Sequence, residues 1–338
     1  NGIKFFDNDG LKIDTKIEEQ ISEEIIKKPQ LVVPSQLGKA TRINDVLGRY
    51  TEFAKITVPT SLTLNGMKIV ADCANGAAYK ILPQILSELG AEVFPVAVNP
   101  DGFNINEECG STKPEKAQKA VLENGADIGI CLDGDADRVL FIDEKGLLAN
   151  GDQVLGLLAK AWINKNFLNK NTVVATVMSN LALELYLEKI GVRLIRTQVG
   201  DKNVSKRMNK EGLNLGGEQS GHLILTDYSN AGDGLITSLQ VLSILVESQK
   251  RASEIFDLFK PFPQSLINID AQKCNDFEKN EQIKNMLGDV QHSLRGKGRI
   301  LIRKSGTEDV VRLMVEHKEK EMLQETIDTC LSILKKKN

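Results

Sequence analysis

The chain has 338 residues, of which 41% are hydrophobic and 26% charged, and its formal net charge is −3. This composition is typical of a folded globular protein, and the length predicts two to four domains. The small negative charge excludes a general attraction to nucleic acid or anionic membrane, so a phosphorylated ligand would need local Arg and Lys groups. No apolar stretch is long enough to cross a bilayer, and the five scattered cysteines without CxxC spacing indicate reduced thiols in a cytoplasmic protein.

Residues 1–55 predict a short strand, Ile3–Phe6, and two helices, near Asp14–Lys27 and Ile43–Lys55. One strand and two helices cannot form an independent core. The chain also opens on Asn-Gly rather than on Met. We therefore expect this segment to be the remnant of a larger first α/β domain, followed by a connector.

From residue 56 onward strands alternate with helices, which is typical of βαβ units built around a mainly parallel sheet. We predict one α/β domain over residues 56–148 and a second over residues 149–258. The expected strands are 67–73, 91–98, 126–132, 139–143, 172–178 and 192–196. The expected helices are 77–89, 115–123, 153–164, 201–211 and 235–248, with one more helix capped by Ser179 or Asn180.

Pro261 and Pro263 mark a linker into the last segment. Residues 259–338 predict a small α+β domain. Its expected strands are 265–270, 299–303 and 310–316, and its expected helices are 275–286 and 319–334.

A run of alternating carboxylates, Asp-Gly-Asp-Ala-Asp-Arg, lies between two strand-like segments. Asp133, Asp135 and Asp137 repel one another unless a cation lies between them, and hard divalent cations such as Mg²⁺ or Ca²⁺ take oxygen ligands of this kind. An EF-hand is an alternative, because Glu144 would be its twelfth position. Arg138 stands where that loop normally has Gly, however, and the flanks are not helical. A metal-free acidic turn remains a further alternative.

The loop after the expected strand 299–303 combines a guanidinium with small hydroxyl and glycine residues. Arg303 offers a planar fork to phosphate oxygens, and Ser305, Gly306 and Thr307 offer hydroxyls and backbone N–H groups. Arg312, in the following strand, is placed to point at the same spot. The alternative is an ordinary charged β-turn.

The segment Gly-Gly-Glu-Gln-Ser-Gly-His follows another expected strand, at the sheet edge where α/β proteins collect ligands. Glu218 and Ser220 could exchange hydrogen bonds with vicinal sugar hydroxyls, and His222 adds an imidazole. The alternative is a glycine-permitted turn with a satisfied histidine. Residues 73–77 are interpreted as a packing turn and 109–112 as a cap of the next helix, and Asp201 is interpreted as a helix N-cap.

Taken in order, these loops resemble the metal, sugar and phosphate loops of the α-D-phosphohexomutase superfamily. Gln219-Ser220, together with segments 104–106 and 109–112, resembles the bacterial phosphoglucosamine mutases within it. The resemblance implies four domains, three of a mixed α/β fold and a last one similar to the TATA-box-binding-protein fold. The implied activity is that of an isomerase. It would interconvert glucosamine 6-phosphate and glucosamine 1-phosphate for UDP-N-acetylglucosamine and cell-wall precursor synthesis.

The same resemblance implies the roles of individual residues and cofactors. Asp133, Asp135 and Asp137 would hold Mg²⁺, and glucosamine 1,6-bisphosphate would be the intermediate and activator. The implied catalytic residues are Lys4, Arg138 and His222, with Arg138 near the transferring phosphoryl and Lys4 exchanging protons with a sugar hydroxyl. The implied substrate-binding residues are Glu218, Ser220, Arg303, Ser305, Gly306, Thr307 and Arg312.

Three departures from the family pattern stand out. Asp309 replaces a usual Pro, and Gln198 replaces a frequent Lys. The phosphoserine loop Ser-His-Asn-Pro, which in the family precedes Asn-Gly-x-Lys, does not occur in these residues. We therefore expect a polypeptide of only these 338 residues to be inactive.

Two other functions stay open at this point. One is that of a phosphomannomutase or phosphoglucomutase, and the other is a non-catalytic module that binds metal and phosphosugar. The expected partner is a phosphosugar, with no nucleic acid and no membrane. A homodimer is one expected assembly, although the sequence does not fix the oligomeric state.

Overall fold

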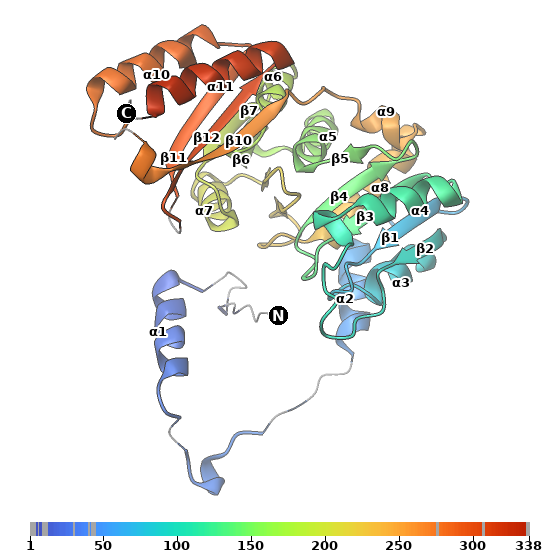
Figure 1. Cartoon of the computed structure of the whole chain (residues 1–338). Coiled ribbons are helices and arrows are strands. Elements are labelled where there is room, and N and C mark those ends of the chain that lie inside the picture. The colour runs from blue at the N-terminus through green and yellow to red at the C-terminus, as the bar shows by residue number, and fades with distance from the viewer. Residues whose placement is uncertain are drawn as a thin grey trace. The chain divides into compact units, whose positions relative to one another are not determined.

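The computed structural model describes residues 5, 7–8, 13–29, 31–39, 41, 45–274, 277–305 and 308–335. Its contacts divide the chain into two compact units, whose helices and strands are labelled in Figure 1. The first unit comprises Asn1–Gly146 and His222–Gln249, and the second comprises Leu147–Gly221 and Lys250–Asn338.

Some expectations fall outside the described residues. Lys4, Gly306 and Thr307 are among them, and so is the expected strand Ile3–Phe6 apart from Phe5. Among the helices that the structure does describe, none combines the length and the apolar character that a membrane crossing requires.

The first unit contains the acidic loop and the two strands that it joins. Its helices are α1 (Thr15–Ile26), η1 (Pro34–Gln36), α2 (Val46–Ile56), α3 (Ile81–Glu88), η2 (Gly110–Thr112), α4 (Glu115–Asn124) and α8 (Gly234–Ser248). Its strands are β1 (Lys68–Asp72), β2 (Glu92–Val96), β3 (Ile128–Leu132), β4 (Val139–Asp143) and β9 (Leu223–Leu225).

The sheet of the first unit follows the order β2-β1-β3-β4. The β2, β1 and β3 strands run parallel, and β4 returns antiparallel to β3, so the sheet is mixed. Every residue of β3 and β4 is buried, because α4 and α8 contact these strands. This burial explains the unbroken apolar runs on either side of the acidic loop, because strands that are covered on both faces need apolar side chains on both.

The second unit contains a βα layer and a C-terminal α+β layer. Its helices are α5 (Gly151–Asn164), η3 (Asn169–Asn171), α6 (Leu181–Lys189), α7 (Asp201–Glu211), α9 (Ala252–Phe256), η4 (Ala271–Lys273), α10 (Glu281–Ser293) and α11 (Lys320–Leu334). Its strands are β5 (Leu148–Ala149), β6 (Thr172–Thr176), β7 (Arg193–Thr197), β8 (Leu215–Gly217), β10 (Gln264–Asp270), β11 (Gly298–Lys304) and β12 (Val310–His317).

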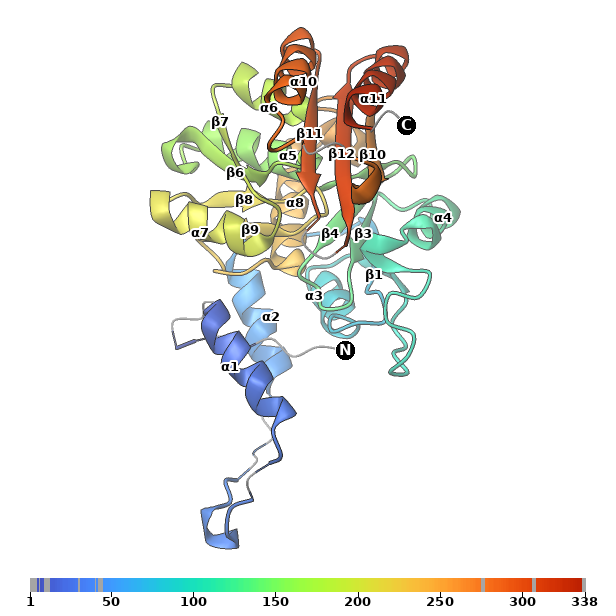
Figure 2. The same ribbon diagram turned by 60° about the vertical axis from the view of Figure 1, so that its left-hand side comes forward.

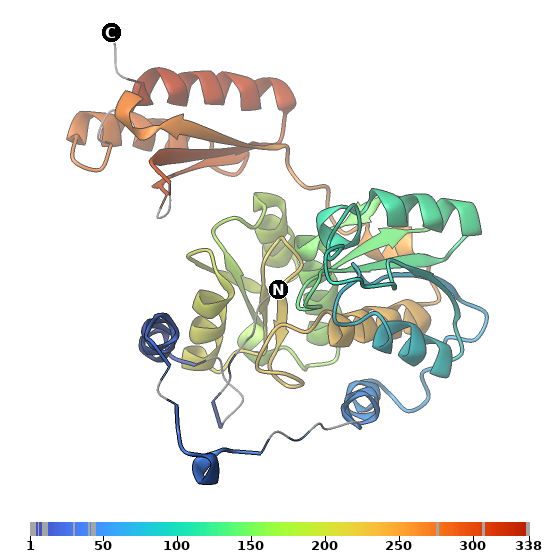
Figure 3. The same ribbon diagram turned by 60° about the horizontal axis from the view of Figure 1, so that its bottom comes forward.

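In the βα layer, β6 lies between β7 and β8 and is parallel to both (Figure 2). In the C-terminal layer, the antiparallel order is β10-β12-β11, and α10 and α11 cover one face of this sheet (Figure 3). The core of the C-terminal layer joins β12 residues such as Leu313 and Val315 to Ile327 and Cys330 of α11. Side chains of β12 therefore alternate between the helix-covered face and the opposite face.

Two helices begin later than predicted, and one predicted N-cap was wrong. The helix expected at 77–89 begins at Ile81, because residues 76–77 turn against the acidic loop. The helix expected at 275–286 begins at Glu281, because the Asn280 side chain caps it by accepting from the backbone N–H of Gln282 and Ile283. The helix α7 has Gly200 rather than Asp201 at its N-cap, so Asp201 is its first residue.

Candidate active site

The acidic loop forms the connection of the β3–β4 hairpin, where Leu132 is paired with Val139. One ligand atom from each of Asp133, Asp135 and Asp137 lies within 4.8 Å of the others. Asp133 is buried, Asp137 is partly buried and Asp135 is exposed. Because both flanks are strands, the structure rules out the EF-hand alternative. The residues present fit a hard divalent cation, with one side of the triad open to a ligand.

The electrostatics of the loop favour a cation. Burial raises the pKa of the Asp133 carboxyl to about 6, although the Arg138 backbone N–H counteracts this, and repulsion from Asp137 and Asp135 acts in the same direction as burial. The Arg138 side chain supplies part of the missing positive charge, with its Nε 2.9 Å from Asp133 Oδ2 and 3.6 Å from Asp137 Oδ1. A divalent ion would supply the remainder.

Neighbouring backbone holds the acidic loop in place. The N–H of Ala77 donates to the carbonyl of Gly134 at 2.8 Å, and a Cβ on Gly76 would lie only 2.2 Å from that carbonyl oxygen. Segment 73–77 is therefore a packing turn, as expected, and its packing partner is the acidic loop.

Segment 109–112 differs from the sequence prediction. It forms η2 and does not cap α4, whose N-cap residue Pro114 makes no side-chain cap bond. The N–H of Gly110 instead donates to the buried carboxylate of Asp72 at 2.8 Å, and a Cβ on Gly110 would lie 2.5 Å from the Leu132 carbonyl oxygen. Sequence reasoning missed Asp72, although a carboxylate ending an apolar strand was a visible signal.

His222 lies beside the acidic loop in the first unit. Its backbone forms an isolated antiparallel bridge with Arg138, and its Nδ1 lies 3.5 Å from Asp137 Oδ1. The residue is 5% exposed, and a Cβ on Gly232 would lie 2.3 Å from His222 Nε2. The structure therefore brings His222 to the predicted metal ligands, in a position to orient Asp137.

The predicted sugar loop lies in the second unit, next to the start of α7. The Gly200 N–H donates to Glu218 Oε1 at 3.0 Å, so the carboxylate sits at a helix N-terminus, where backbone dipoles favour negative charge. Gly151, at the start of α5, donates to the Gln219 carbonyl at 3.0 Å. Ser220 is exposed. Two helix N-termini therefore hold the sugar loop.

The predicted phosphate loop joins β11 to β12, and Arg303 is paired directly with Arg312 across the two strands. Arg312 Nη2 lies 2.7 Å from Glu308 Oε2, while its buried Nε makes no hydrogen bond within the described residues. The Glu308 N–H is 3.3 Å from the Ser305 hydroxyl oxygen. Two adjacent guanidinium groups repel each other, and a phosphate dianion between them would remove that repulsion.

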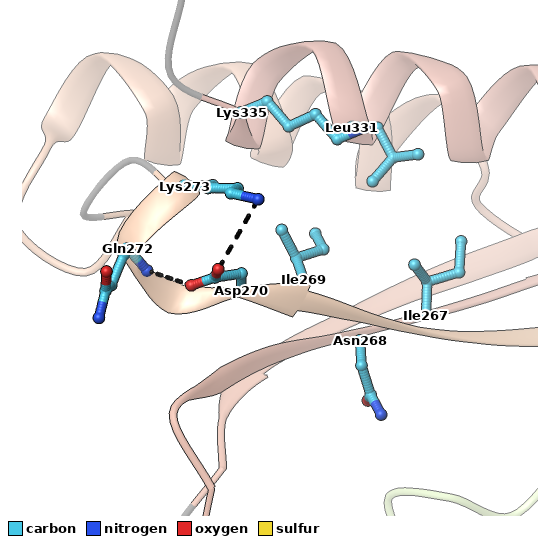
Figure 4. Close-up of a pocket in the computed structure, with 8 residues that line it drawn as sticks. All are labelled: Ile267, Asn268, Ile269, Asp270, Gln272, Lys273, Leu331 and Lys335. Atoms are coloured by element: carbon cyan, nitrogen blue, oxygen red, sulfur yellow. Dashed lines mark hydrogen bonds and ion pairs between the residues drawn. The ribbon is translucent and has the colours of Figure 1, made fainter.

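A cavity of about 760 Å³ opens elsewhere in the C-terminal layer, between β10 and the end of α11 (Figure 4). Two of its charged residues form an ion pair, with Lys273 Nζ 4.0 Å from Asp270 Oδ2. None of the residues expected to bind substrate lines it. The lining residues are Ile267, Asn268, Ile269, Asp270, Gln272, Lys273, Leu331 and Lys335.

Comparison with known families agrees with this fold. Residues 49–146 match the phosphoglucomutase/phosphomannomutase α/β/α domain II, residues 150–262 match α/β/α domain III, and residues 266–330 match the C-terminal domain of the same proteins. The chain thus contains domains II and III and the C-terminal domain of the phosphohexomutases.

Curated relatives narrow this class. A phosphoglucosamine mutase of Zymomonas mobilis is 49% identical over 328 residues, which is 97% of this chain and 74% of that protein. A phosphoglucosamine mutase of Dinoroseobacter shibae is 50% identical over 327 residues, or 97% of this chain and 73% of that protein. The chain belongs to the phosphoglucosamine mutase family of isomerases.

Solved structures agree on the fold. A phosphoglucomutase/phosphomannomutase family protein from Burkholderia thailandensis superimposes with a TM-score of 0.71 at 21% identity. The match covers 85% of this chain and 64% of that one, so the chain spans less than two thirds of that protein.

Proposed function

We propose that the residues described above serve the interconversion of glucosamine 6-phosphate and glucosamine 1-phosphate. The observation that carries the proposal is the acidic triad gathered on the β3–β4 hairpin of a chain from this family. Glucosamine 1,6-bisphosphate would be the intermediate and activator, and a phosphoserine would be the covalent carrier.

The acidic loop would bind the metal and the phosphoryl group. Asp133, Asp135 and Asp137 would hold Mg²⁺, which neutralises charge on a phosphoryl group in transfer. Arg138, in contact with Asp133, would place a second positive charge beside that phosphoryl. His222 would act beside them by orienting Asp137. Lys4 remains a proposed proton-exchange residue on the family resemblance alone.

The second unit would bind the rest of the substrate. Glu218 and Ser220 would bond sugar hydroxyls, and the Glu218 charge would favour an aminosugar ammonium group. Arg303, Arg312 and Ser305, together with Gly306 and Thr307, would hold the phosphate that is not transferred. The paired arginines and the buried Nε of Arg312 support this assignment.

The metabolic context follows from this activity. The product would supply UDP-N-acetylglucosamine and cell-wall precursor synthesis in the cytoplasm. Five buried cysteines without a disulfide are consistent with that reducing compartment. A homodimer remains a prediction.

The test is turnover by the gene product that contains this chain. Glucosamine 6-phosphate, glucose 6-phosphate and mannose 6-phosphate are compared with Mg²⁺ and the matching bisphosphate present. We expect the amino sugar to give the highest kcat/KM, and an Asp135→Asn variant to lose activity. Equal or better turnover of glucose or mannose phosphate would favour the neutral-sugar mutases, and binding without turnover would favour a binding module.

A further inference from the structure

A buried ion pair joins the two layers of the second unit. Glu316 of β12 is fully buried, and its Oε2 accepts from Arg299 Nε at 2.7 Å and from the Leu181 N–H at 3.0 Å. Arg299 Nη2 donates to the Ser179 carbonyl at 2.6 Å. The carboxylate and the guanidinium of the C-terminal layer are thus both bonded to the β6–α6 connection of the βα layer. We call this pair the clamp.

The same connection is bonded to the start of α5. The buried Asp152 carboxylate accepts from the Asn180 N–H at 2.8 Å. The Asn180 side chain in turn accepts from the Phe262 N–H at 2.9 Å and donates to the Phe262 carbonyl at 3.0 Å. These two bonds hold the linker that leads into the C-terminal layer against the β6–α6 connection. Gly151, adjacent to Asp152, bonds the sugar loop. Hydrogen bonds, together with the peptide links Gly151–Asp152 and Asn180–Leu181, therefore connect the sugar loop to the clamp.

The clamp and the phosphate-binding arginines share one face of one strand pair. Arg299 is paired with Glu316, and Arg303 is paired with Arg312, four residues further along both strands. Because side chains alternate with a period of two, all four lie on the same face, opposite the helix-covered core. At about 3.4 Å per residue, the two pairs are about 14 Å apart. A small rotation at the clamp would therefore displace the arginines at the far end.

We propose that Arg299 and Glu316 are positioning residues that hold the phosphate loop at one fixed separation from the sugar loop. A phosphosugar spans both loops, so its binding needs that separation, whereas inorganic phosphate needs the phosphate loop alone. This inference rests on the proposed function, because it takes the two loops as halves of one substrate site. A 1 Å error in placement is enough to cost a bridging ligand much of its affinity.

The first experiment measures the separation directly. Ser220 and Lys304 are both exposed, so each is replaced by cysteine in one double variant, Ser220→Cys with Lys304→Cys, and both cysteines are spin-labelled. Pulsed electron paramagnetic resonance then records the distribution of distances between the two labels. The five native cysteines are buried. We expect one narrow distribution in the parent and a broadened or shifted one in Arg299→Met, with Arg299→Lys in between. A narrow, unshifted distribution in Arg299→Met overturns the proposal, and so does a parent that is already broad.

The second experiment separates positioning from local damage. Binding of glucosamine 6-phosphate and of inorganic phosphate is measured by calorimetry for each variant without labels. Arg299→Met should lower the affinity for glucosamine 6-phosphate by about tenfold, which is the scale of one lost hydrogen bond to a charged group. Its affinity for inorganic phosphate should fall by less than about twofold. The control is Arg193→Met, which breaks the Arg193–Glu211 ion pair in the same unit and should change neither.

The two measurements distinguish the possible failures. If Arg299→Met weakens both ligands equally, the pair only supports the local fold and the proposal is wrong. If the parent does not bind glucosamine 6-phosphate, the proposed function fails, while the distance measurement still decides whether the clamp fixes the two loops.

Discussion

Two loops that carry candidate site residues both join antiparallel strands. Residues 133–138 join β3 to β4, and residues 305–309 join β11 to β12. The first loop is supported where it stands, since Ala77 bonds Gly134 and Gly76 leaves no room for a side chain. At the second loop, we propose that the paired arginines Arg303 and Arg312 are positioned through the clamp, about 14 Å away along the same strands. A site can therefore be fixed by direct contact or at a distance through a strand pair.

The first prediction breaks the direct support of the acidic loop. A Gly76→Ala methyl would meet backbone atoms of Gly134 at 2.2–2.6 Å, which cannot move like a side chain. We expect a loss of about 3 kcal/mol in the free energy of unfolding, measured by urea denaturation, together with lost Mg²⁺ binding. The control is Gly48→Ala in α2, where nothing lies within 4 Å and stability should stay equal or rise slightly. Similar behaviour of both variants would mean that the turn does not support the loop.

The second prediction removes a metal ligand without disturbing the packing. Asp133→Asn should lower the affinity for Mg²⁺ by about a hundredfold or more. Even the loss of a residue that only hydrogen-bonds to a metal ligand typically lowers metal affinity by about 10- to 100-fold. In the metal-free protein the same variant should be as stable as the parent or more stable, because a buried carboxylate among like charges is removed. Calorimetry and urea denaturation measure the two effects. Unchanged Mg²⁺ affinity would refute the metal assignment.

The third prediction addresses the far end of the β11–β12 pair. Arg303→Ala should weaken glucosamine 6-phosphate and inorganic phosphate together, by about 1.5–3 kcal/mol, since it removes charged hydrogen bonds to the phosphate itself. This pattern contrasts with that of Arg299→Met, which should spare inorganic phosphate. Lys304→Ala, on the neighbouring residue, is the matched control and should have little effect. If Arg303→Ala binds both ligands like the parent, the phosphate assignment is wrong.

The smallest expected effect is a pH dependence of Mg²⁺ binding to the acidic loop. The pKa of Asp133 is raised to about 6, so the metal-free carboxyl takes up a proton as the pH falls through 6. Mg²⁺ must displace that proton, so its apparent affinity should fall by about tenfold for each pH unit below 6. Metal-free stability should change in the opposite sense, rising as the pH falls through 6, because the folded state binds this proton more tightly than the unfolded state. Calorimetry from pH 5 to 8 tests the first effect, and a flat profile would contradict it.

The sequence predicted those parts of the fold and the site that are local. Apolar segments predicted most strands of the three sheets, although the short strands β5 and β9 were not predicted. The acidic loop and the arginine loop were recognisable because their residues are adjacent in the chain. Helix starts were less predictable. For α10, nothing in the sequence favoured Asn280 over Asn275 as the N-cap. For α3, the late start depends on a segment that is distant in sequence, the loop at Gly134.

Long-range polar contacts escaped sequence reasoning altogether. Glu316 bonds the N–H of Leu181 across a separation of 135 residues, and Asn180 bonds Phe262 across 82. Nothing local to either residue signals its partner. The strand RILIR did contain a hint, because Arg299 and Arg303 had to share one face of the sheet. That Arg299 contacts the β6–α6 connection could be learned only from the fold.

Full burial of Glu316 also constrains how the family can diverge. Loss of Arg299 alone would leave a carboxylate uncompensated away from water, at a cost of about 3–5 kcal/mol, whereas replacing both residues by apolar ones can be neutral. Positions 299 and 316 should therefore change together across homologues. Lineages that have given up the charged pair should have exchanged both residues, and an aligned set of such proteins would carry that joint substitution as a historical trace of the contact.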